Sequence, residues 1–288
     1  MHIKKTSVNK KRVISCGDKI LNLEEARIMG ILNLTDDSFY DGGKYNNADK
    51  YIARAAELIE CGAHIIDIGA ASTRPGAKLI SDKEEWEVLQ KPLDEIRKHF
   101  PDIIISVDTY NASQIKKCAD AGVNIINDIS GGSWNENMFT EISKYQMAYV
   151  LMHIKGQPDN MQKAPVYHSV TNEVQAYFKS KIDELEALGF SNIILDPGFG
   201  FGKDIEHNYE LLANLKELTT LDYPVLVGLS RKSMVFKVLN NTAKESLNGT
   251  TVLNTLALQN GAQILRVHDV KEASETIKLF GYYSNNAT

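Results

Sequence analysis

Short apolar runs recur along the chain and are separated by longer amphipathic stretches. The runs occupy residues 28–32, 65–68, 103–107, 124–129, 148–152, 192–195, 225–229 and 263–267. They are too short for helices, and their near-continuous hydrophobicity is typical of strands that are buried on both faces. The pattern therefore predicts eight buried strands.

Apolar residues at helical spacing mark the segments between these runs. Ser81 and Glu84 form the sequence pattern of a capping box, and apolar residues follow it at intervals of three and four. Pro92 lies inside this helix and is expected to kink it. Further helices are predicted around residues 48–59 and 174–185, and each is followed by a glycine that can terminate a helix.

Strands that alternate with helices predict a (β/α)8 barrel in a single domain. An open, doubly wound sheet is the alternative, but a last helical stretch at residues 271–280 follows the eighth strand and would complete the ring of a barrel. Residues 12–22 are predicted to form a hairpin that closes the bottom of the barrel. The expected organisation is an N-terminal extension with this hairpin at residues 1–25 and a barrel at residues 26–284.

Composition narrows the class of protein. The chain has 288 residues, 43% of them hydrophobic, and a formal net charge of −5, which argues against a binder of nucleic acid. It has no apolar run long enough to span a membrane, and its polar, basic start is not followed by the apolar core of a secretory signal. Its three cysteines lack paired spacing, and Cys61 and Cys118 are expected to be buried on helices. We therefore expect a reduced protein of the cytoplasm.

Polar side chains follow the ends of all the predicted strands. Barrel enzymes build their active sites at the carboxyl ends of their strands. A single polar residue at a strand end is explained equally well as a helix cap or a hydrogen-bonded core group. Many such residues on one rim of the barrel favour a ligand site instead. These residues are Asn33, Arg74, Asp108, Asn127, Asp128, His153, Asp196, Ser230, Arg231, Lys232, Ser233, Arg266, His268 and Asp269.

The residue types indicate two kinds of ligand chemistry. Asp108, Asn127 and Asp196 suit the hydrogen-bonding edge of a flat heterocycle. A cationic set suits phosphate or carboxylate, and it contains Arg74, Arg231, Lys232, Arg266 and His268. The region after the last two strands is the usual phosphate site of this fold, although Arg231 and Lys232 alone are also read as a solvated charge pair.

Two glycine-rich loops add to the rim. Residues 36–43 contain three acids and a glycine pair, and are expected to be a mobile lid that assists Mg2+, or else a plain acidic surface loop. Residues 196–203 contain glycines that allow a ligand to approach the backbone and a phenylalanine that can stack on it.

The order and content of these motifs resemble the dihydropteroate synthase family. The resemblance runs from the first predicted strand to the last, with two departures: Asp36 stands where the family commonly has proline, and Ala71 where it commonly has glutamate. The matching segments are Met29-Gly-Ile-Leu-Asn33, Asp37-Ser-Phe39, Asp41-Gly-Gly43, Ile66-Asp-Ile-Gly69, Ser72-Thr-Arg-Pro-Gly76, Ser106-Val-Asp-Thr109, Ile126-Asn-Asp128, Ser130-Gly-Gly132, Leu151-Met-His153, Asp196-Pro-Gly198, Gly200-Phe-Gly-Lys203, Ser230-Arg-Lys-Ser233 and Arg266-Val-His-Asp269.

The resemblance implies a transferase of folate biosynthesis. In that reaction, 6-hydroxymethyl-7,8-dihydropterin diphosphate condenses with 4-aminobenzoate to give 7,8-dihydropteroate and diphosphate, by a dissociative, SN1-like substitution that requires Mg2+. The resemblance also implies inhibition by sulfonamides and a homodimer.

The same resemblance implies roles for individual residues. The pterin would be held by Asp108, Asn127, Asp196 and Lys232. The diphosphate would be bound by Asn33, Arg74, Arg266 and His268, with Asn33 also the ligand of Mg2+. The 4-aminobenzoate site would be lined by Phe39, Thr73, Pro75, Phe201 and Ser233. The catalytic set would be Asn33, Asp41, Arg74, Asp108, Lys232, Arg266 and His268.

Two other functions compete with this interpretation. A corrinoid methyltransferase that uses methyltetrahydrofolate would share the pterin carboxylates but would not need the cationic set or the loop at 72–76. A non-catalytic pterin-binding protein on the same fold would have lost some of the strand-end groups. Diphosphate release that depends on 4-aminobenzoate distinguishes the synthase from both.

Overall fold

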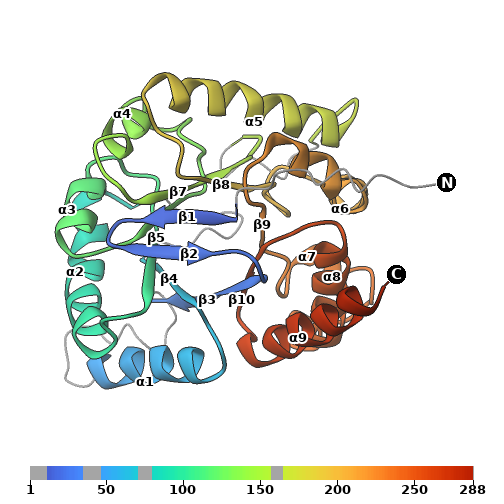
Figure 1. Cartoon of the computed structure of the whole chain (residues 1–288), viewed down its shortest axis with the longest axis horizontal. Coiled ribbons are helices and arrows are strands. Elements are labelled where there is room, and N and C mark those ends of the chain that lie inside the picture. The colour runs from blue at the N-terminus through green and yellow to red at the C-terminus, as the bar shows by residue number, and fades with distance from the viewer. Residues whose placement is uncertain (1–11, 35–46, 71–79, 157–164, 288) are drawn as a thin grey trace.

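A computed structural model describes residues 12–34, 47–70, 80–156 and 165–287 of the chain. In these parts, parallel strands form a central sheet that curls into a barrel, and helices surround it (Figure 1). The barrel strands are β3 (Arg27–Asn33), β4 (Ile65–Gly69), β5 (Ile104–Asp108), β6 (Ile125–Asp128), β7 (Ala148–Met152), β8 (Ile193–Asp196), β9 (Leu226–Val227) and β10 (Ile264–Val267).

The sheet has the strand order β8-β7-β6-β5-β4-β3-β10-β9, so β8 and β9 are its two edges. These edges meet, because Leu195 forms a parallel bridge with Val225 and its backbone N–H donates to the carbonyl of Pro224 at 2.8 Å. The ring is thereby closed, as a (β/α)8 barrel requires. The predicted fold class is confirmed.

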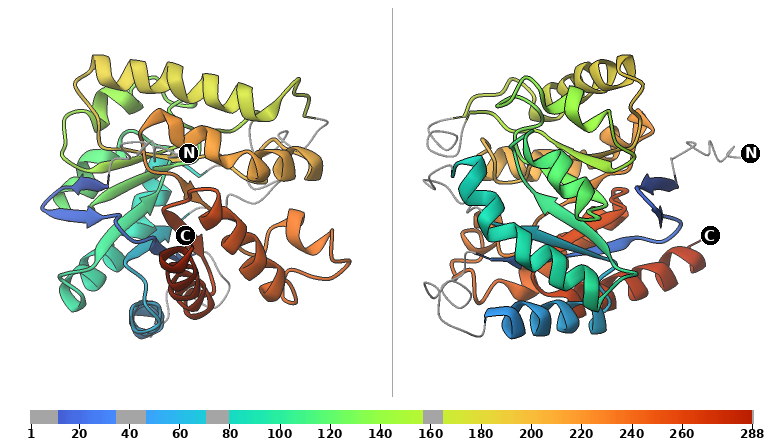
Figure 2. Two further views of the ribbon diagram at one scale, coloured as in Figure 1. Left: turned by 45° about the vertical axis from the view of Figure 1, so that its right-hand side comes forward. Right: turned by 90° about the vertical axis from the view of Figure 1, so that its left-hand side faces the viewer.

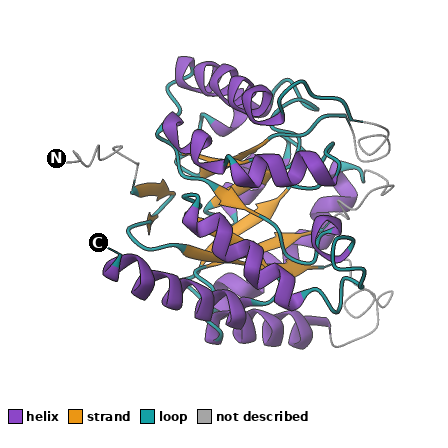
Figure 3. Ribbon diagram, turned by 90° about the vertical axis from the view of Figure 1, so that its right-hand side faces the viewer, coloured by secondary structure: helices purple, strands orange, loops and turns teal. Residues whose placement is uncertain are grey.

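Helices follow the strands and form the outer layer (Figure 3). No helix in the described part of the chain combines the length and the apolar composition needed to cross a bilayer. The helices are α1 (Asn47–Glu60), α2 (Asp82–His99), α3 (Gln114–Asp120), α4 (Met138–Ile142), α5 (Val170–Ala187), α6 (Ile205–Ala213), the 3-10 helix η1 (Leu215–Leu221), α7 (Ser233–Phe236), α8 (Leu247–Gln259) and α9 (Val270–Asn286).

The predicted capping box begins α2. The Ser81 hydroxyl accepts from the backbone N–H of Glu84, and the Glu84 carboxylate accepts from the backbone N–H of Ser81 at 2.9 Å. These bonds satisfy two backbone donors that the first turn of a helix leaves free. The helix continues through the buried Pro92 to His99.

A hairpin of β1 (Val13–Cys16) and β2 (Lys19–Asn22) crosses the amino-terminal end of the barrel (Figures 1 and 2). Its buried side chains Ile14 and Leu21 join a cluster made by the first inward residues of the strands, among them Ile65 and Ile125. The side-chain amide of Asn124 also donates to the carbonyl of Cys16 at 3.0 Å. The predicted closure of the barrel bottom is confirmed.

The cysteines differ in burial. Cys16 and Cys118 are buried, whereas Cys61 follows the last residue of α1 and is only partly buried, so the prediction that it is buried on a helix is wrong. All three are free thiols.

Candidate active site

The barrel interior changes from apolar to polar along the strands. Alternate residues of a strand face the same side, so the inward positions follow one another in steps of two. The first inward layer is apolar and contains Met29, Ile65, Ile104 and Ile125. Two residues further along the same or neighbouring strands, the inward layer contains Asp67, Ser106, Asn127 and Arg266. The polar side chains are thus at the carboxyl ends, opposite the hairpin.

Asp67 connects the side chains of this layer. Its carboxylate is fully buried and accepts from the hydroxyl of Ser106 at 2.6 Å. It also accepts from Nε of Arg266 at 2.7 Å and from Nδ2 of Asn127 at 3.1 Å. Because the amide nitrogen of Asn127 faces Asp67, its carbonyl oxygen is left for other donors. Asp67 is not among the residues expected at the site, although an acid inside an apolar run, at an inward position, indicates a role.

Arg266 also donates to Asp108, from an Nη to a carboxylate oxygen at 3.1 Å. Burial raises the pKa of Asp108 to about 7, although Arg266 opposes the shift, and Asp67 and Glu85 add to it. Burial alone would lower the pKa of Arg266, but Asp67 and Asp108 together raise it above its ordinary value. The guanidinium therefore keeps its charge, and of these two groups Asp108 is the one whose pKa lies near neutral pH.

Asp196 and Lys232 are the next pair of opposite charges in the site. Asp196 is buried at the end of β8, and one of its oxygens accepts from the backbone N–H of Gly198 at 2.8 Å. Burial raises its pKa, and the nearby Lys232 opposes that shift. Burial lowers the pKa of Lys232 to about 8, with Asp196 opposing.

The Lys232 ammonium is held by the loop that follows β8. It donates to the backbone carbonyl of Phe199 and lies 4.8 Å from the centroid of the Phe201 ring, a cation–π distance. Phe201 packs against the small cluster of Tyr110, Ile129 and Met152. Lys232 is thus oriented by a hydrogen bond and by an aromatic face.

His268 follows β10 and contacts Ser230. The Ser230 oxygen accepts from the backbone N–H of His268 at 3.3 Å and lies 3.0 Å from its Nδ1. Burial, followed by Arg266, lowers the pKa of His268 to about 4, so the ring is neutral at neutral pH. In the tautomer in which the Ser230 hydroxyl donates to Nδ1, the ring proton is on Nε2, and His268 can donate it to a ligand as a neutral ring.

Arg231 is engaged elsewhere. It forms an ion pair with Asp269 through two hydrogen bonds of 3.0 and 2.6 Å. The helix at Ser233 has only four residues and its first turn has no side-chain cap. The charge of Arg231 is therefore balanced by Asp269, a partner that the sequence-based interpretation did not include.

Asn33 lies beside Asp108 at the rim. A Cβ built on Gly69 would be 3.5 Å from the Asn33 amide oxygen and 3.7 Å from the Asp108 Cβ, so both side chains flank this glycine. The described residues contain no group of three or more His, Cys, Asp and Glu side chains that could hold a metal ion. Five expected site residues, and the departures Asp36 and Ala71, lie outside the described residues; the five are Phe39, Asp41, Thr73, Arg74 and Pro75.

Two residues expected on the rim make contacts that hold the scaffold. The Asp128 carboxylate accepts from the backbone N–H groups of Ser130 and Gly132, at 2.7 and 2.8 Å, and from the hydroxyl of Tyr149 at 2.6 Å. The His153 Nδ1 lies 2.9 Å from the Nζ of Lys203. Both side chains are buried.

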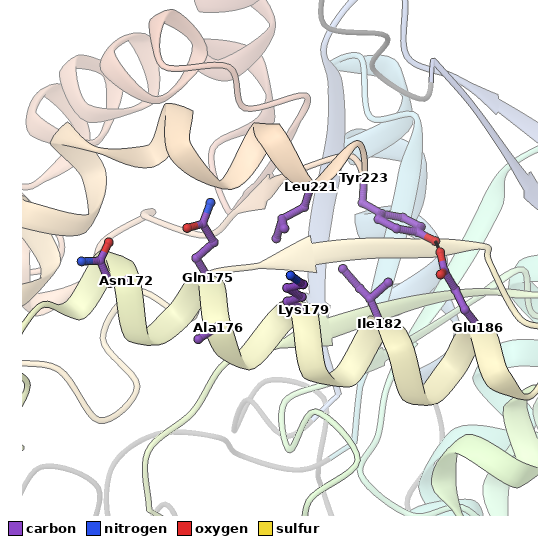
Figure 4. Close-up of a pocket in the computed structure, with 8 residues that line it drawn as sticks. All are labelled: Asn172, Gln175, Ala176, Lys179, Ile182, Glu186, Leu221 and Tyr223. Atoms are coloured by element: carbon purple, nitrogen blue, oxygen red, sulfur yellow. Dashed lines mark hydrogen bonds between the residues drawn. The ribbon is translucent and has the colours of Figure 1, made fainter.

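A pocket lies on the outside of the barrel, between α5 and the end of η1 with the residues that follow it (Figure 4). Tyr223 closes one end of it through a hydrogen bond to the Glu186 carboxylate. Gln175, on the same helix, donates to the carbonyl of Glu217 at 3.0 Å. None of the strand-end residues line this pocket, so it is separate from the candidate site.

Comparison with known proteins gives consistent matches. The family model described as "Pterin binding enzyme" matches residues 29–268. The dihydropteroate synthase of Haemophilus influenzae is 40% identical over 270 residues, which are 93% of this chain and 98% of that protein. The dihydropteroate synthase of Escherichia coli K12 is 42% identical over 261 residues, 90% of this chain and 92% of that protein.

Solved structures agree with these matches. A crystal structure of the Yersinia pestis dihydropteroate synthase with a sulfonamide drug complex has a TM-score of 0.88 and 39% identity, and covers 95% of this chain and 99% of that one. The Xanthomonas albilineans dihydropteroate synthase with 4-aminobenzoic acid has a TM-score of 0.88 and 32% identity, and covers 96% and 99%.

Proposed function

This chain belongs to the dihydropteroate synthase family, and from that membership and the geometry of its strand ends we propose the reaction that it catalyses. It joins 6-hydroxymethyl-7,8-dihydropterin diphosphate to 4-aminobenzoate and releases 7,8-dihydropteroate and diphosphate. It is a transferase of folate biosynthesis.

The observation that carries the proposal is the set of fixed polar groups around Arg266. Asp196 has one carboxylate oxygen besides the one that accepts from Gly198, and Asn127 has its carbonyl oxygen. Such acceptors suit the N–H groups of an amino-pyrimidinone ring, and a carboxylate can accept two of them in parallel. Asp108 adds a further carboxyl group, and Lys232 supplies a donor for the ring's acceptor atoms. These four residues are the pterin site that we assign.

The diphosphate leaves before the new bond forms. The bond between the methylene carbon and the diphosphate oxygen breaks, and its electron pair departs with the diphosphate. Loss of the diphosphate leaves a pterin-methyl cation. The neutral amine of 4-aminobenzoate is a weak nucleophile and requires a strong electrophile of this kind. The amine nitrogen then bonds to the methylene carbon and loses a proton. No covalent attachment to the protein is needed.

Arg266 and His268 stabilise the departing charge. Arg266 retains its positive charge because two carboxylates contact it. His268 contributes the N–H of a neutral ring rather than a second charge. Preorganised donors of this kind lower the barrier because they need no rearrangement as charge develops. Arg74, outside the described residues, completes this set by family resemblance.

Mg2+ fits this arrangement as an ion held mainly by the diphosphate and by water. Asn33 offers one hard amide oxygen at the rim, and Mg2+ prefers oxygen ligands in an octahedron that usually includes water. When bound, the ion neutralises charge on the leaving group. Asn33 is the protein ligand that we assign to it.

The 4-aminobenzoate site lies beside the loop after β8. Phe201 and Ser233 are its described members. Phe39, Thr73 and Pro75 complete it by family resemblance, and Asp41 adds a catalytic loop residue. Sulfonamides resemble 4-aminobenzoate in shape and are expected to compete for the same site.

We also propose a homodimer in the cytoplasm. Large apolar side chains are exposed on α8 and α9, two helices that pack side by side, and a second copy of the chain would cover them. They are Val252, Leu256, Leu279, Tyr282 and Tyr283. The free thiols are consistent with a reducing compartment.

A coupled assay tests the activity. Purified protein is incubated with the dihydropterin diphosphate, 4-aminobenzoate and Mg2+, and both products are measured. We expect one diphosphate for each dihydropteroate, and competitive inhibition by sulfamethoxazole against 4-aminobenzoate. Diphosphate release that does not respond to 4-aminobenzoate would contradict the assignment.

Chelation provides a second arm of the same test. Removing Mg2+ should weaken binding of the diphosphate substrate and leave binding of 6-hydroxymethylpterin unchanged, because the ion contacts the diphosphate. Tight Mg2+ binding by the protein without substrate would contradict this part of the proposal.

A further inference from the structure

Lys203 is a buried lysine that the reaction described above does not use. Only 2% of it is exposed, and its Nζ lies 2.9 Å from Nδ1 of His153. The same nitrogen donates to the backbone carbonyls of Gly198 at 3.0 Å and Phe201 at 3.1 Å. In the described part of the chain no carboxylate forms an ion pair with it. A buried ammonium is costly unless its donors are satisfied, and here carbonyl oxygens and a ring nitrogen surround it.

The contacts of Lys203 join two loops at the rim. Gly198 has a φ of +66°, and a Cβ there would collide with the carbonyl oxygen of His153. Gly202 has a φ of +61°, and a Cβ there would collide with the carbonyl oxygen of Lys155. The Tyr167 hydroxyl donates to the Gly202 carbonyl at 2.8 Å. The segment from Gly198 to Gly202 therefore lies directly against the residues that follow β7.

This segment is the one that orients Lys232. The Phe199 carbonyl accepts from the Lys232 ammonium, and the Phe201 ring lies under it. The Phe199 carbonyl lies between the two carbonyls that Lys203 holds, and the Phe201 ring belongs to the same residue as the second of them. A change at Lys203 would release the carbonyls of Gly198 and Phe201 and alter the direction of the groups between and beside them.

We propose that Lys203 is a positioning residue, which fixes the loop after β8 so that the Phe199 carbonyl and the Phe201 ring aim Lys232 at the pterin. The proposal rests on the pterin site assigned above. It makes two lysines act in series: Lys203 contacts only protein, and Lys232 contacts the ligand. Burial lowers the pKa of Lys203 to about 7; Asp196 opposes this shift and Lys232 adds to it.

The test is a double-mutant cycle. Lys203→Met keeps the length and apolar part of the side chain and removes its donors, and Lys232→Met removes the group through which Lys203 is proposed to act. Affinity for 6-hydroxymethylpterin is measured by calorimetry in the wild type, both single variants and the double variant. We expect Lys203→Met to weaken binding about tenfold. We expect no further weakening when it is added to Lys232→Met, since coupled residues are not additive.

Steady-state kinetics separate positioning from general structural damage. In Lys203→Met the KM for the pterin diphosphate should rise about tenfold, and the KM for 4-aminobenzoate, whose site shares only Phe201 with this loop, should rise less. Lys181→Met is the matched control, because this lysine on α5 pairs with Glu184 at the surface and has no contact with the loop. It should leave both KM values unchanged.

The outcomes are distinct. A wild type that binds no pterin would show that the proposed function is wrong, whatever the variants do. A wild type that binds pterin, with equal affinity in Lys203→Met, would overturn the positioning role, and so would additive effects in the cycle. If Lys203→Met does not fold, Tyr167→Phe decides. It removes one anchor of the same loop and should weaken pterin binding about twofold, again without further effect in Lys232→Met. Unchanged affinity in Tyr167→Phe would then overturn the proposal.

Discussion

Asp67 receives hydrogen bonds from side chains of three other strands, at Ser106, Asn127 and Arg266. A single carboxylate therefore decides which way an amide and a guanidinium face. Side chains that contact the ligand are therefore oriented by others that do not contact it. A substitution at a contact residue and one at an orienting residue should have different effects.

Asp196→Asn tests a contact residue. The amide would keep an oxygen for the Gly198 N–H and present its NH2 group to ligand donors, where an acceptor is needed. We expect the affinity for 6-hydroxymethylpterin to fall about a hundredfold, as for other lost charge-assisted pairs. Calorimetry measures it, with the exposed Asp222→Asn as the matched control. Near-normal affinity in Asp196→Asn would remove Asp196 from the pterin site.

Asp108 gives a prediction about pH. Its pKa rises from an ordinary 3.8 to about 7 in the folded protein, so between these values the folded state binds a proton that the unfolded state has lost. The contribution of Asp108 to stability is complete below pH 3.8 and is lost as the pH rises through 7.

Asp108→Asn should therefore gain stability relative to the wild type as the pH is raised from 4.5 to 7.5. Urea unfolding midpoints of both proteins at the two pH values measure this difference. A constant difference between them would mean that Asp108 titrates in its ordinary range.

At the scale of elements, the hairpin and the strand ends divide the barrel. The hairpin contributes apolar side chains to the amino-terminal layer, and the polar layers begin above it. Substitutions in the hairpin should change the free energy of unfolding and leave catalysis unchanged. The reason is that the amino-terminal end of such a barrel contributes to its stability, whereas the active site lies at the other end.

Leu21→Ala tests this separation. Leu21 is buried under the barrel, so its truncation should lower the free energy of unfolding by about 3 kcal/mol, from lost burial and the cavity left behind. The KM values for both substrates should not change. Ile20→Ala is the matched control on the same strand, because Ile20 is 70% exposed and should cost little. Equal losses in the two variants would contradict the packing assigned to the hairpin.

The elements were predictable because their patterns are local. The apolar run at 148–152 coincides with β7, and the capping box begins α2 where Ser81 predicts it. The run at 225–229 forms a strand of only two residues, Leu226–Val227. Its first residue, Val225, forms only an isolated bridge to Leu195. Long-range partners were not predictable: Asp269, 38 residues from Arg231, pairs with that arginine. The neutrality of His268 depends on burial, which no local pattern reveals.

At the scale of the whole molecule, large apolar side chains stay exposed on two neighbouring helices. Leu279 and Tyr282 are 73% and 78% exposed on α9, and Leu256 on α8 lies on the neighbouring helix. The barrel core is complete without them, so they are available to a second copy of the chain.

Leu256→Lys should therefore weaken the proposed homodimer. A charge in an apolar interface is desolvated without a partner, and we expect the dissociation constant to rise at least about tenfold. Sedimentation equilibrium measures it, and Leu188→Lys, at an exposed position after α5, is the matched control. A wild type that sediments as a monomer would refute the dimer.

The hydrogen bonds that converge on Asp67 also have an entropic consequence. Side chains that are held before a ligand arrives have already given up their rotational freedom, and that loss occurs when the chain folds rather than when the ligand binds. A rigid bicyclic ring entering such a cage would freeze few additional torsions, so its recognition would be governed by enthalpy and shape. The same hydrogen bonds, which join four strands, also limit how far the side chains of the site can rearrange around a ligand of another shape. Selectivity for the ring is therefore a property of the barrel itself.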